Sequence, residues 1–486
     1  MSFNVKIGRI ESPAATGNQS YTGYGFQPKC LLFYTMLNSL NDGSVQSYTR
    51  QAVGATSGTA NRWACGTAQD DSQATSNTAR SFVIDKCIHT TSGSSSVEFS
   101  ADLVSFNADG FTLNWTTTIA SGYEWVVVAF GGTDISIDVD SFNAASGSVA
   151  VTGVGFQPTG LMLSYSKNDT TVGEEAEASY VEGWTDGTNK NCSSWVDDDA
   201  LATSDNSSLV TSSYLLRHIN DASTRVSANL TSFDADGFTL NFATASDTPK
   251  IGYVAFRGVD IKTGVFTAQT DTNDQTVTGV GFTPSLVLFR GSNCIAEDTE
   301  TDGVRWFWGM GVSSSEQSTL ASYSGDGFDT THCRKNTRND DVINYVSFVT
   351  SAAAVTGAAD MKSLDADGFT IDWTIAMPLA SKVYYLAFGV HETSSSSPSK
   401  SPSKSPSVSP SPSSAGNNIN TLTDNFNDNS FDTGKWTSSL WNSATLAEAN
   451  QQLEITAPIT TQAGSYVTSN THYSCDGSQQ LSKLFL

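Results

Sequence analysis

The sequence has 486 residues, of which only 15% are charged. A chain of this length exceeds one ordinary hydrophobic core, and its polar, turn-rich composition predicts about three to four mostly β units. The formal net charge of −24 at pH 7 repels phosphate backbones and anionic lipid surfaces, so nucleic acids and membranes are not expected as partners.

Cysteine usage predicts no cross-linked or metal-bound framework. No Cys-x-x-Cys pair occurs, and the seven cysteines do not share positions between the three repeats of the chain, so we expect neither zinc sites nor a disulfide pattern. The first residues contain no apolar signal core, and no run of about 18 apolar residues occurs anywhere. Neither a secretory signal nor a transmembrane helix is therefore expected.

Three similar blocks follow one another along the chain. Their opening runs align without a gap from Asn4, Asp134 and Asp260 to a shared Gly-Phe pair, and each block closes with an apolar run ending in Ala-Phe. The repeat length is that of a whole domain, too long for a solenoid unit that cannot fold alone. The sequence therefore predicts three tandem domains, at residues 1–132, 133–258 and 259–391.

Each block has the pattern of antiparallel β-structure. In FTLNW, Phe111, Leu113 and Trp115 alternate with polar residues, which predicts a strand with one wet face. The runs WVVVAF (125–130) and LMLSY (161–165) are almost continuously apolar, as expected of strands that are covered on both faces. We predict an antiparallel β-sandwich for each block, with a barrel as the alternative.

An Asp-Gly pair lies between two alternating strands of every block, within NADG (107–110), DADG (234–237) and DADG (365–368). Asp-Gly in this place predicts a hairpin turn, because Gly adopts positive φ freely and Asp hydrogen-bonds to nearby backbone. A calcium loop of the EF-hand type would need Glu at the twelfth position counted from Asp234, and that residue is Ala245. No cofactor is expected, and a looser Ca²⁺ site is the remaining alternative.

The middle segments of the blocks differ in length and carry both aromatic and acidic residues. Tryptophan can stack on sugar rings while Asp accepts hydrogen bonds from hydroxyl groups, so a glycan-binding site is one interpretation. In the other, the tryptophans fill cores and the acids occupy solvated turns. The candidate ligand-binding residues are Trp63, Asp71, Trp184, Asp198, Trp306 and Asp326.

No catalytic signature is present. The five histidines belong to no Gly-x-Ser-x-Gly elbow and no His-x-x-x-His metal motif, so an enzyme is not predicted. Paired carboxylates for glycoside cleavage could still lie among the loop acids, because their spacing is set by the fold. A secreted carbohydrate-active enzyme is therefore the alternative function.

The composition changes abruptly after the third block. Residues 392–418 are rich in Ser and Pro and cannot bury enough apolar surface to fold, which predicts a disordered spacer. Residues 419–486 resume a β-type pattern but are few for a sandwich, so we expect a partial β segment.

Two resemblances refine the expected function. The Gly-Phe-x-Pro opening, the Asp-Gly-Phe-Thr hairpin and the closing Ala-Phe strand of residues 1–391 resemble β modules of phage and prophage tail or appendage proteins. The run DNFNDNSFDTGKW (424–436) resembles the start of concanavalin-like, laminin-G-like jelly rolls, a family that often binds carbohydrate. The first resemblance implies a virion structural protein without enzymatic activity, released by lysis.

We therefore predict a virion or extracellular-surface protein with structural and adhesive roles. Its expected partners are a host-surface glycan or protein, contacted through variable loops, and other subunits of the same assembly. A pure scaffold without any ligand is a further alternative.

Overall fold

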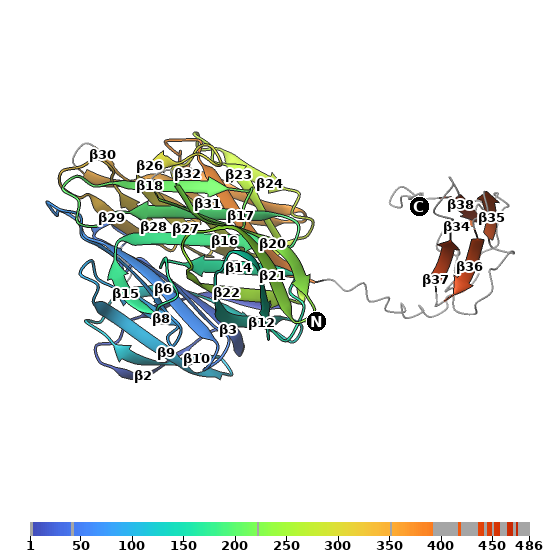
Figure 1. Ribbon diagram of the computed structural model, residues 1–486, viewed down its shortest axis with the longest axis horizontal. Helices are drawn as coiled ribbons and strands as arrows, with labels where there is room; N and C mark the ends of the chain where they lie inside the picture. The colour runs from blue at the N-terminus through green and yellow to red at the C-terminus, as the bar shows by residue number, and fades with distance from the viewer. Residues whose placement is uncertain are drawn as a thin grey trace, which may run out of the picture. The chain divides into compact units, whose positions relative to one another are not determined.

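The computed structural model describes residues 3–39, 43–220, 223–349 and 352–391, followed by six short strands between Asn417 and Ser474. It divides into two compact units, Met1–Ser395 and Ser396–Leu486. Every regular element in the described residues is a β-strand, and none of them is helical (Figure 1). The all-β class and the antiparallel sheets predicted for the three blocks are confirmed.

The first repeat forms two facing sheets. The larger has the strand order β1-β11-β3-β5-β6-β7-β15, and the smaller has the order β2-β10-β9-β8. The strands of this repeat are β1 (Asn4–Glu11), β2 (Gly17–Thr22), β3 (Pro28–Thr35), β4 (Gln46–Ser47), β5 (Thr49–Thr56), β6 (Arg62–Gln69), β7 (Thr78–Val83), β8 (Ile88–Thr91), β9 (Val97–Asn107), β10 (Gly110–Thr117) and β11 (Glu124–Gly131).

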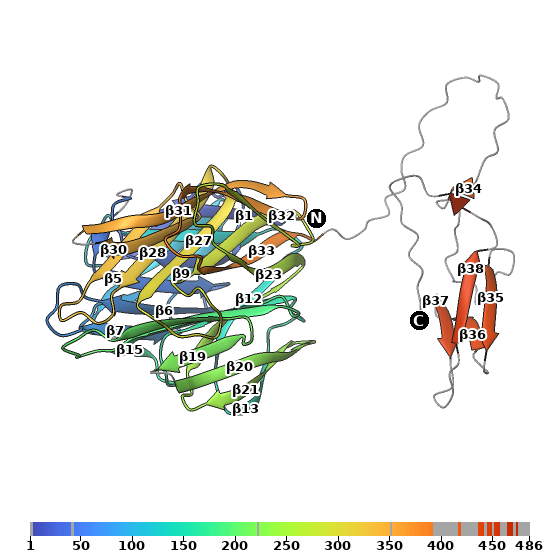
Figure 2. The same cartoon turned by 90° about the horizontal axis from the view of Figure 1, so that it is seen from above.

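The second repeat has the same plan, with sheets β12-β22-β14-β16-β17-β18-β26 and β13-β21-β20-β19. In Figure 2 its smaller sheet lies at the outside of the block. Its strands are β12 (Ser136–Asn143), β13 (Gly147–Thr152), β14 (Gly160–Tyr165), β15 (Gly173–Ala176), β16 (Ala178–Thr185), β17 (Lys190–Asp197), β18 (Asn206–Thr211), β19 (Leu216–Asn220), β20 (Ser223–Asp234), β21 (Gly237–Ala245) and β22 (Lys250–Arg257).

The third repeat repeats the plan again, with sheets β23-β33-β25-β27-β28-β29-β4 and β24-β32-β31-β30. Its strands are β23 (Val259–Thr267), β24 (Asp274–Thr278), β25 (Pro284–Gly291), β26 (Thr301–Asp302), β27 (Val304–Ser313), β28 (Glu316–Ser324), β29 (Cys333–Arg338), β30 (Ile343–Val349), β31 (Ala352–Asp365), β32 (Gly368–Ile375) and β33 (Lys382–Val390).

Each repeat contributes one short strand, its lent strand, to the larger sheet of a neighbouring repeat. Strand β15 of the second repeat pairs with β7 of the first, β26 of the third pairs with β18 of the second, and β4 of the first pairs with β29 of the third. The lent strands all come from the same loop of the repeat, so the exchange closes into a ring. An open sheet edge is a site of unwanted pairing, and the ring covers three of them.

The outer edge strand of each larger sheet is also shielded by the neighbouring repeat. The Ile7 amide donates to Glu316 Oε1 at 2.8 Å, and the Val139 amide donates to Ser57 Oγ at 3.1 Å. The Thr263 amide donates to Asp186 Oδ2 at 3.2 Å. These side chains satisfy backbone donors that would otherwise be open to another strand.

Three equivalent phenylalanines meet where the repeats converge. The ring centroids of Phe130 and Phe256 are 5.6 Å apart, those of Phe130 and Phe388 are 5.4 Å apart, and those of Phe256 and Phe388 are 5.1 Å apart. All three rings are fully buried. Mutual contact of three equivalent residues requires an approximate threefold axis through the block.

The same strand faces both the shared core and its own sandwich. In β11, Val126, Val128 and Phe130 belong to the core that joins the repeats. Val127 and Ala129 belong to the separate core inside the first sandwich. The continuous apolar run of this strand is explained by burial on both faces, as the sequence predicted.

The three repeats are therefore not separate compact units. Residues up to Ser395 form one compact unit, because each large sheet contains a strand of a neighbour. The domain boundaries at 132/133 and 258/259 stay predictions, since no boundary separates the repeats spatially at these points.

The Asp-Gly pairs form hairpin turns that also clamp a second loop. Asp109 accepts hydrogen bonds from the amides of Gly25 at 2.5 Å and Gly23 at 3.0 Å. The same pattern joins Asp236 to Gly153 and Gly155, and Asp367 to Gly279 and Gly281. The Asp-Gly turn and the Gly-x-Gly loop of each repeat thus stabilise each other, and both have a structural role in the sandwich.

Replacement of Gly237 by alanine should lower the free energy of unfolding by about 1–3 kcal/mol. Gly237 has φ of +146°, and a Cβ there would lie 2.0 Å from the Val151 carbonyl oxygen. Gly155→Ala is the matched control, because Gly155 has φ of +82° but a Cβ there would meet nothing within 4 Å. Denaturant titration should show the larger loss for Gly237→Ala; equal losses would contradict the role of this close approach.

The second compact unit is described only by paired strands. Strands β34 (Asn417–Asn418) and β39 (Tyr473–Ser474) are parallel, whereas β35 (Trp436–Trp441) pairs with β38 (Gly464–Ser469) and β36 (Thr445–Ala449) with β37 (Gln452–Thr456), both antiparallel. Most of the predicted spacer and of the predicted partial jelly roll lies outside the described residues.

Candidate functional site

The three candidate tryptophans lie in the core and not on loops. Trp63, Trp184 and Trp306 have exposed fractions of 2%, 1% and 1%. The Trp63 indole donates to the Tyr253 carbonyl at 3.0 Å, which joins the first repeat to the second. Trp306 makes an edge contact with Tyr180, with centroids 5.4 Å apart. These rings fill space between repeats, so the glycan platform predicted from them is not present on the surface.

The candidate aspartates include a shared position with a structural role. Asp71 Oδ1 accepts a hydrogen bond from the Cys333 amide at 2.9 Å, and Asp326 Oδ1 accepts one from the Asn206 amide at 2.9 Å. The equivalent residue of the second repeat is Asp199, whose Oδ1 accepts from the Thr78 amide at 2.8 Å. Each carboxylate caps the first amide of a strand in the neighbouring repeat, so Asp198 is not the equivalent of Asp71.

A second set of equivalent residues meets at the same end of the strands, two residues before each capping aspartate. Ser324 Oγ donates to Asp197 Oδ2 at 2.7 Å, and Gln69 Nε2 donates to the same oxygen. Burial raises the pKa of Asp197 to about 7, although these two hydrogen bonds act in the opposite direction. A raised carboxyl pKa is common at catalytic sites, but this group is buried between three repeats with no room for a substrate.

The Asp197→Asn variant should remove a pH dependence of stability. The folded pKa of about 7 lies above the ordinary value of 3.8, so the protonated carboxyl contributes stability below about pH 4 that is lost as pH rises to about 7. Between pH 5 and 6 the stability of the variant relative to the parent should rise by about 1.4 kcal/mol per pH unit. Unfolding titrations at both pH values test this, and a constant difference would contradict it.

The six described cysteines and His218 are also buried. Burial raises the thiol pKa of the six described cysteines, Cys30, Cys65, Cys87, Cys192, Cys294 and Cys333, and none of these six is disulfide-bonded. Burial lowers the pKa of His218 to about 3, and neither of its ring nitrogens has a hydrogen-bond partner. These groups have neither the ionisation state nor the access of a nucleophile or a base.

Over the part of the chain that is described, no cluster of three or more His, Cys, Asp or Glu side chains could hold a metal ion. The same residues include no helix long and apolar enough to cross a lipid bilayer.

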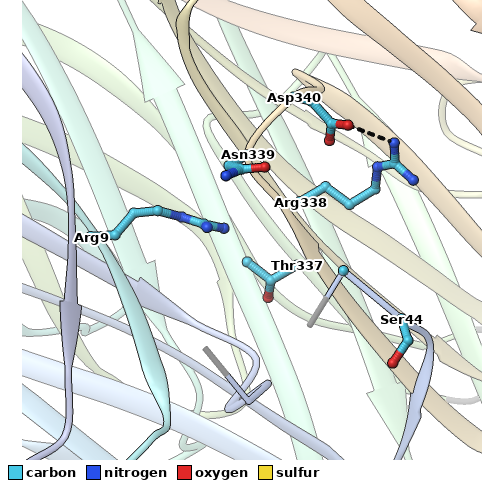
Figure 3. Close-up of a pocket in the computed structure, with 7 residues that line it drawn as sticks. Arg9, Ser44, Thr337, Arg338, Asn339 and Asp340 are labelled. Atoms are coloured by element: carbon cyan, nitrogen blue, oxygen red, sulfur yellow. Dashed lines mark hydrogen bonds and ion pairs between the residues drawn. The ribbon is translucent and has the colours of Figure 1, made fainter. Parts of the chain in front are cut away.

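A polar pocket lies between the third and the first repeat. It has a volume of about 380 Å³ and is lined by Arg9, Gly43, Ser44, Thr337, Arg338, Asn339 and Asp340. Figure 3 shows Arg9 reaching in from the first repeat toward Thr337 and Asn339 of the third. Gly43 and Ser44 belong to the loop that carries the lent strand β4, so the strand exchange itself builds one wall.

Both guanidinium groups of the pocket are paired with carboxylates. Arg9 Nη2 lies 2.6 Å from Glu124 Oε1, and Arg338 Nη2 lies 3.0 Å from Asp340 Oδ2. Arg338 also pairs with Asp341, a carboxyl whose pKa is raised to about 8 by burial and by its neighbour Asp360. The pocket therefore has donors and acceptors but no excess of positive charge.

The equivalent grooves of the other repeats lack both arginines. Strand register places Ser141 and Val265 at the position of Arg9, and Val83 and Thr211 at the position of Arg338. Asp340 corresponds to Asp85 and Ser213. Among the three grooves, only the one between the third and first repeats carries two arginines.

Comparison with models of protein families, with curated proteins and with solved structures gives no match. The sequence prediction did not include Arg9, Arg338 or Asp340, because Arg9 lies far from the other two in the sequence. The signal that could have found the two arginines is their absence from the other two repeats at corresponding positions.

Proposed function

We propose that this chain is a structural and adhesive protein of a virion appendage or a cell surface. The observation that carries the proposal is the ring of lent strands β4, β15 and β26, which locks three sandwiches into one block. A block of this kind suits a protein that bears load or presents contacts in a fixed arrangement. The resemblance of residues 1–391 to phage tail and appendage modules supports the same function.

The two ends of the sandwich strands carry different features, as expected of a protein that is held on a support at one end and presents its contacts at the other. At one end Phe3 stacks on Phe130, and Phe388 lies three residues before His391, so both ends of the block are close to the aromatic cluster. At the other end lie three equivalent loops, which we call the rim loops: residues 70–77, 198–205 and 325–332. A support attached to the block near Phe3 or His391 would leave the rim loops facing away from it.

The rim loops hold one another through backbone hydrogen bonds. The Ser76 amide donates to the Leu201 carbonyl at 2.8 Å, and the Ser204 amide donates to the Phe328 carbonyl at 2.9 Å. The Ser72 amide donates to the Thr331 carbonyl at 2.8 Å, which completes the cycle. A rim fixed in this way loses little conformational entropy on binding, which favours an adhesive surface.

Binding to a surface without chemical change is the test of this proposal. Fluorescently labelled full-length chain should bind a panel of polysaccharides, glycan arrays or whole cells and release no reducing ends from the polysaccharides. Release of reducing ends would favour the carbohydrate-active enzyme instead. Assembly into an ordered structure without binding to any surface would favour the pure scaffold.

A further inference from the structure

The pocket between the third and first repeats is lined by polar residues and one glycine, and its size suits a small ligand. Its volume of about 380 Å³ lies within the range of about 300–1,000 Å³ that is usual for ligand pockets. No aromatic or branched apolar side chain lines it. An apolar ligand would lose its hydration without gaining apolar contacts there, so the pocket selects for ligands rich in hydrogen-bonding groups.

The lining offers both donors and acceptors of hydrogen bonds. Arg9 and Arg338 are donors, Asp340 is an acceptor, and Asn339 and Ser44 are both. The side chains of Asn339 and Ser44 are exposed, and Asn339 makes no hydrogen bond to the described part of the chain. These groups can exchange water for the hydroxyl groups of a ligand at little cost.

The charge balance argues against an ionic ligand. Each guanidinium already faces a carboxylate, with Arg9 paired to Glu124 and Arg338 paired to Asp340. The formal net charge of −24 adds a repulsive field for anions. A cation in turn would have to approach two guanidinium groups. An uncharged ligand avoids both penalties.

We propose that this pocket binds an uncharged, hydroxyl-rich sugar unit of a surface glycan. The inference rests on the proposed adhesive function and names its ligand class and its site. Adjacent sugar hydroxyls donate to the Asp340 carboxylate and accept from Arg9 and Asn339. The two equivalent grooves carry Ser141 or Val265 in place of Arg9, so the block presents one such site and not three.

The absence of an aromatic platform sets the strength of the interaction. Stacking on a Trp or Tyr face usually supplies much of the affinity for sugars, and the lining has none. Single-site binding is therefore weak, and densely displayed glycans are the appropriate probe because multivalent presentation raises apparent affinity.

The test is binding of the full-length chain to a glycan array that carries neutral, sialylated and sulfated glycans. We expect binding to neutral glycans, reduced about tenfold or more by Asp340→Ser, which copies Ser213 of the second repeat. The side chain of Asp340 is 64% exposed, so this variant should fold. Asn339→Ala should weaken binding in the same direction.

Asp85→Ser is the matched control. Asp85 occupies the equivalent turn of the first repeat, its side chain is 67% exposed and it pairs with Lys86 as Asp340 pairs with Arg338. This variant should leave binding unchanged.

Each other outcome overturns a defined part of the account. Neutral-glycan binding that is retained by both Asp340→Ser and Asn339→Ala would place the adhesive site elsewhere and overturn this inference alone. Strict preference for sialylated or sulfated glycans would overturn the uncharged ligand class. Absence of binding to every glycan would overturn this inference, and the adhesive part of the proposed function would fail only if whole cells were not bound either.

Discussion

Replacement of Arg290 by methionine should lower the free energy of unfolding by about 3–5 kcal/mol. Arg290 and Glu182 are both fully buried, with Nη1 of Arg290 3.8 Å from Oε2 of Glu182. Removal of the guanidinium leaves a buried carboxylate without its opposite charge, which is among the most destabilising single changes known.

The surrounding contacts show how closely the guanidinium is held. It lies 4.0 Å from the ring centroid of Trp184, and Nη2 donates to the Asn191 carbonyl at 3.0 Å. The indole nitrogens of Trp184 and Trp308 donate to Glu182 at 3.1 Å and 2.8 Å. This network joins β16 and β17 of the second repeat to β25 and β27 of the third, so its loss should loosen the junction between them.

A double variant separates the unpaired charge from the lost contacts. Combined Glu182→Gln and Arg290→Met should be less destabilised than Arg290→Met alone, because no buried carboxylate then remains. Urea unfolding with a constant m-value provides the comparison. A loss below about 1 kcal/mol for Arg290→Met, or a double variant as unstable as the sum of the single ones, would contradict the account of the pair.

Replacement of Phe256 by alanine should also cost about 3–5 kcal/mol. Its ring contacts both Phe130 and Phe388 at the convergence of the repeats, and the three rings are fully buried. The cavity would be lined by rigid strands of all three repeats and could collapse only in part, which raises the cost of a large-to-small change.

The threefold arrangement makes this prediction unusually specific. Phe130→Ala and Phe388→Ala should give losses similar to that of Phe256→Ala when unfolding is followed by tryptophan fluorescence. A loss in one variant that is several-fold smaller than in the other two would show that the rings do not share one environment.

Local features of the fold could be predicted from the sequence. The hairpin at Asp109 and Gly110 depends on two adjacent residues whose backbone preferences are strong, so the pattern alone was sufficient. The alternation of Phe111, Leu113 and Trp115 likewise predicted a strand with one buried face, and all three side chains are buried. In these places the chemistry of neighbouring residues decides the structure.

The lent strands could not be predicted in this way. Their sequences, QS in β4, GEEA in β15 and TD in β26, are short and polar, with no alternation to mark them as strands. They are strands only because a neighbouring sheet offers an edge at the right distance. Such pairing depends on tertiary structure that a local pattern does not encode.

The alignment of the repeats also contained an error that the structure corrects. Ungapped alignment equates Asn4 with Asp134, whereas pairing with the closing strands equates Asn4 with Ser136. The loop before β13 is shorter than its counterparts, and the shortening conceals the true register. A run of three acids likewise obscured that Asp199, and not Asp198, occupies the shared capping position.

Tryptophan placement shows why residue type alone did not locate the site. Trp63, Trp184 and Trp306 are equally suited to a sugar platform and to a buried interface, and the sequence pattern does not distinguish the two environments. The interface between the repeats determines that these tryptophans are buried, because it covers surfaces that would be exposed in separate domains.

Hydrogen exchange followed by mass spectrometry at increasing denaturant concentration tests the central claim most directly, namely that the three repeats form one interlocked block. The account predicts that peptides from all three repeats, including Gly173–Ala176, lose protection together at one denaturant concentration. Separate midpoints for the three repeats, with the lent strands unprotected throughout, would contradict it.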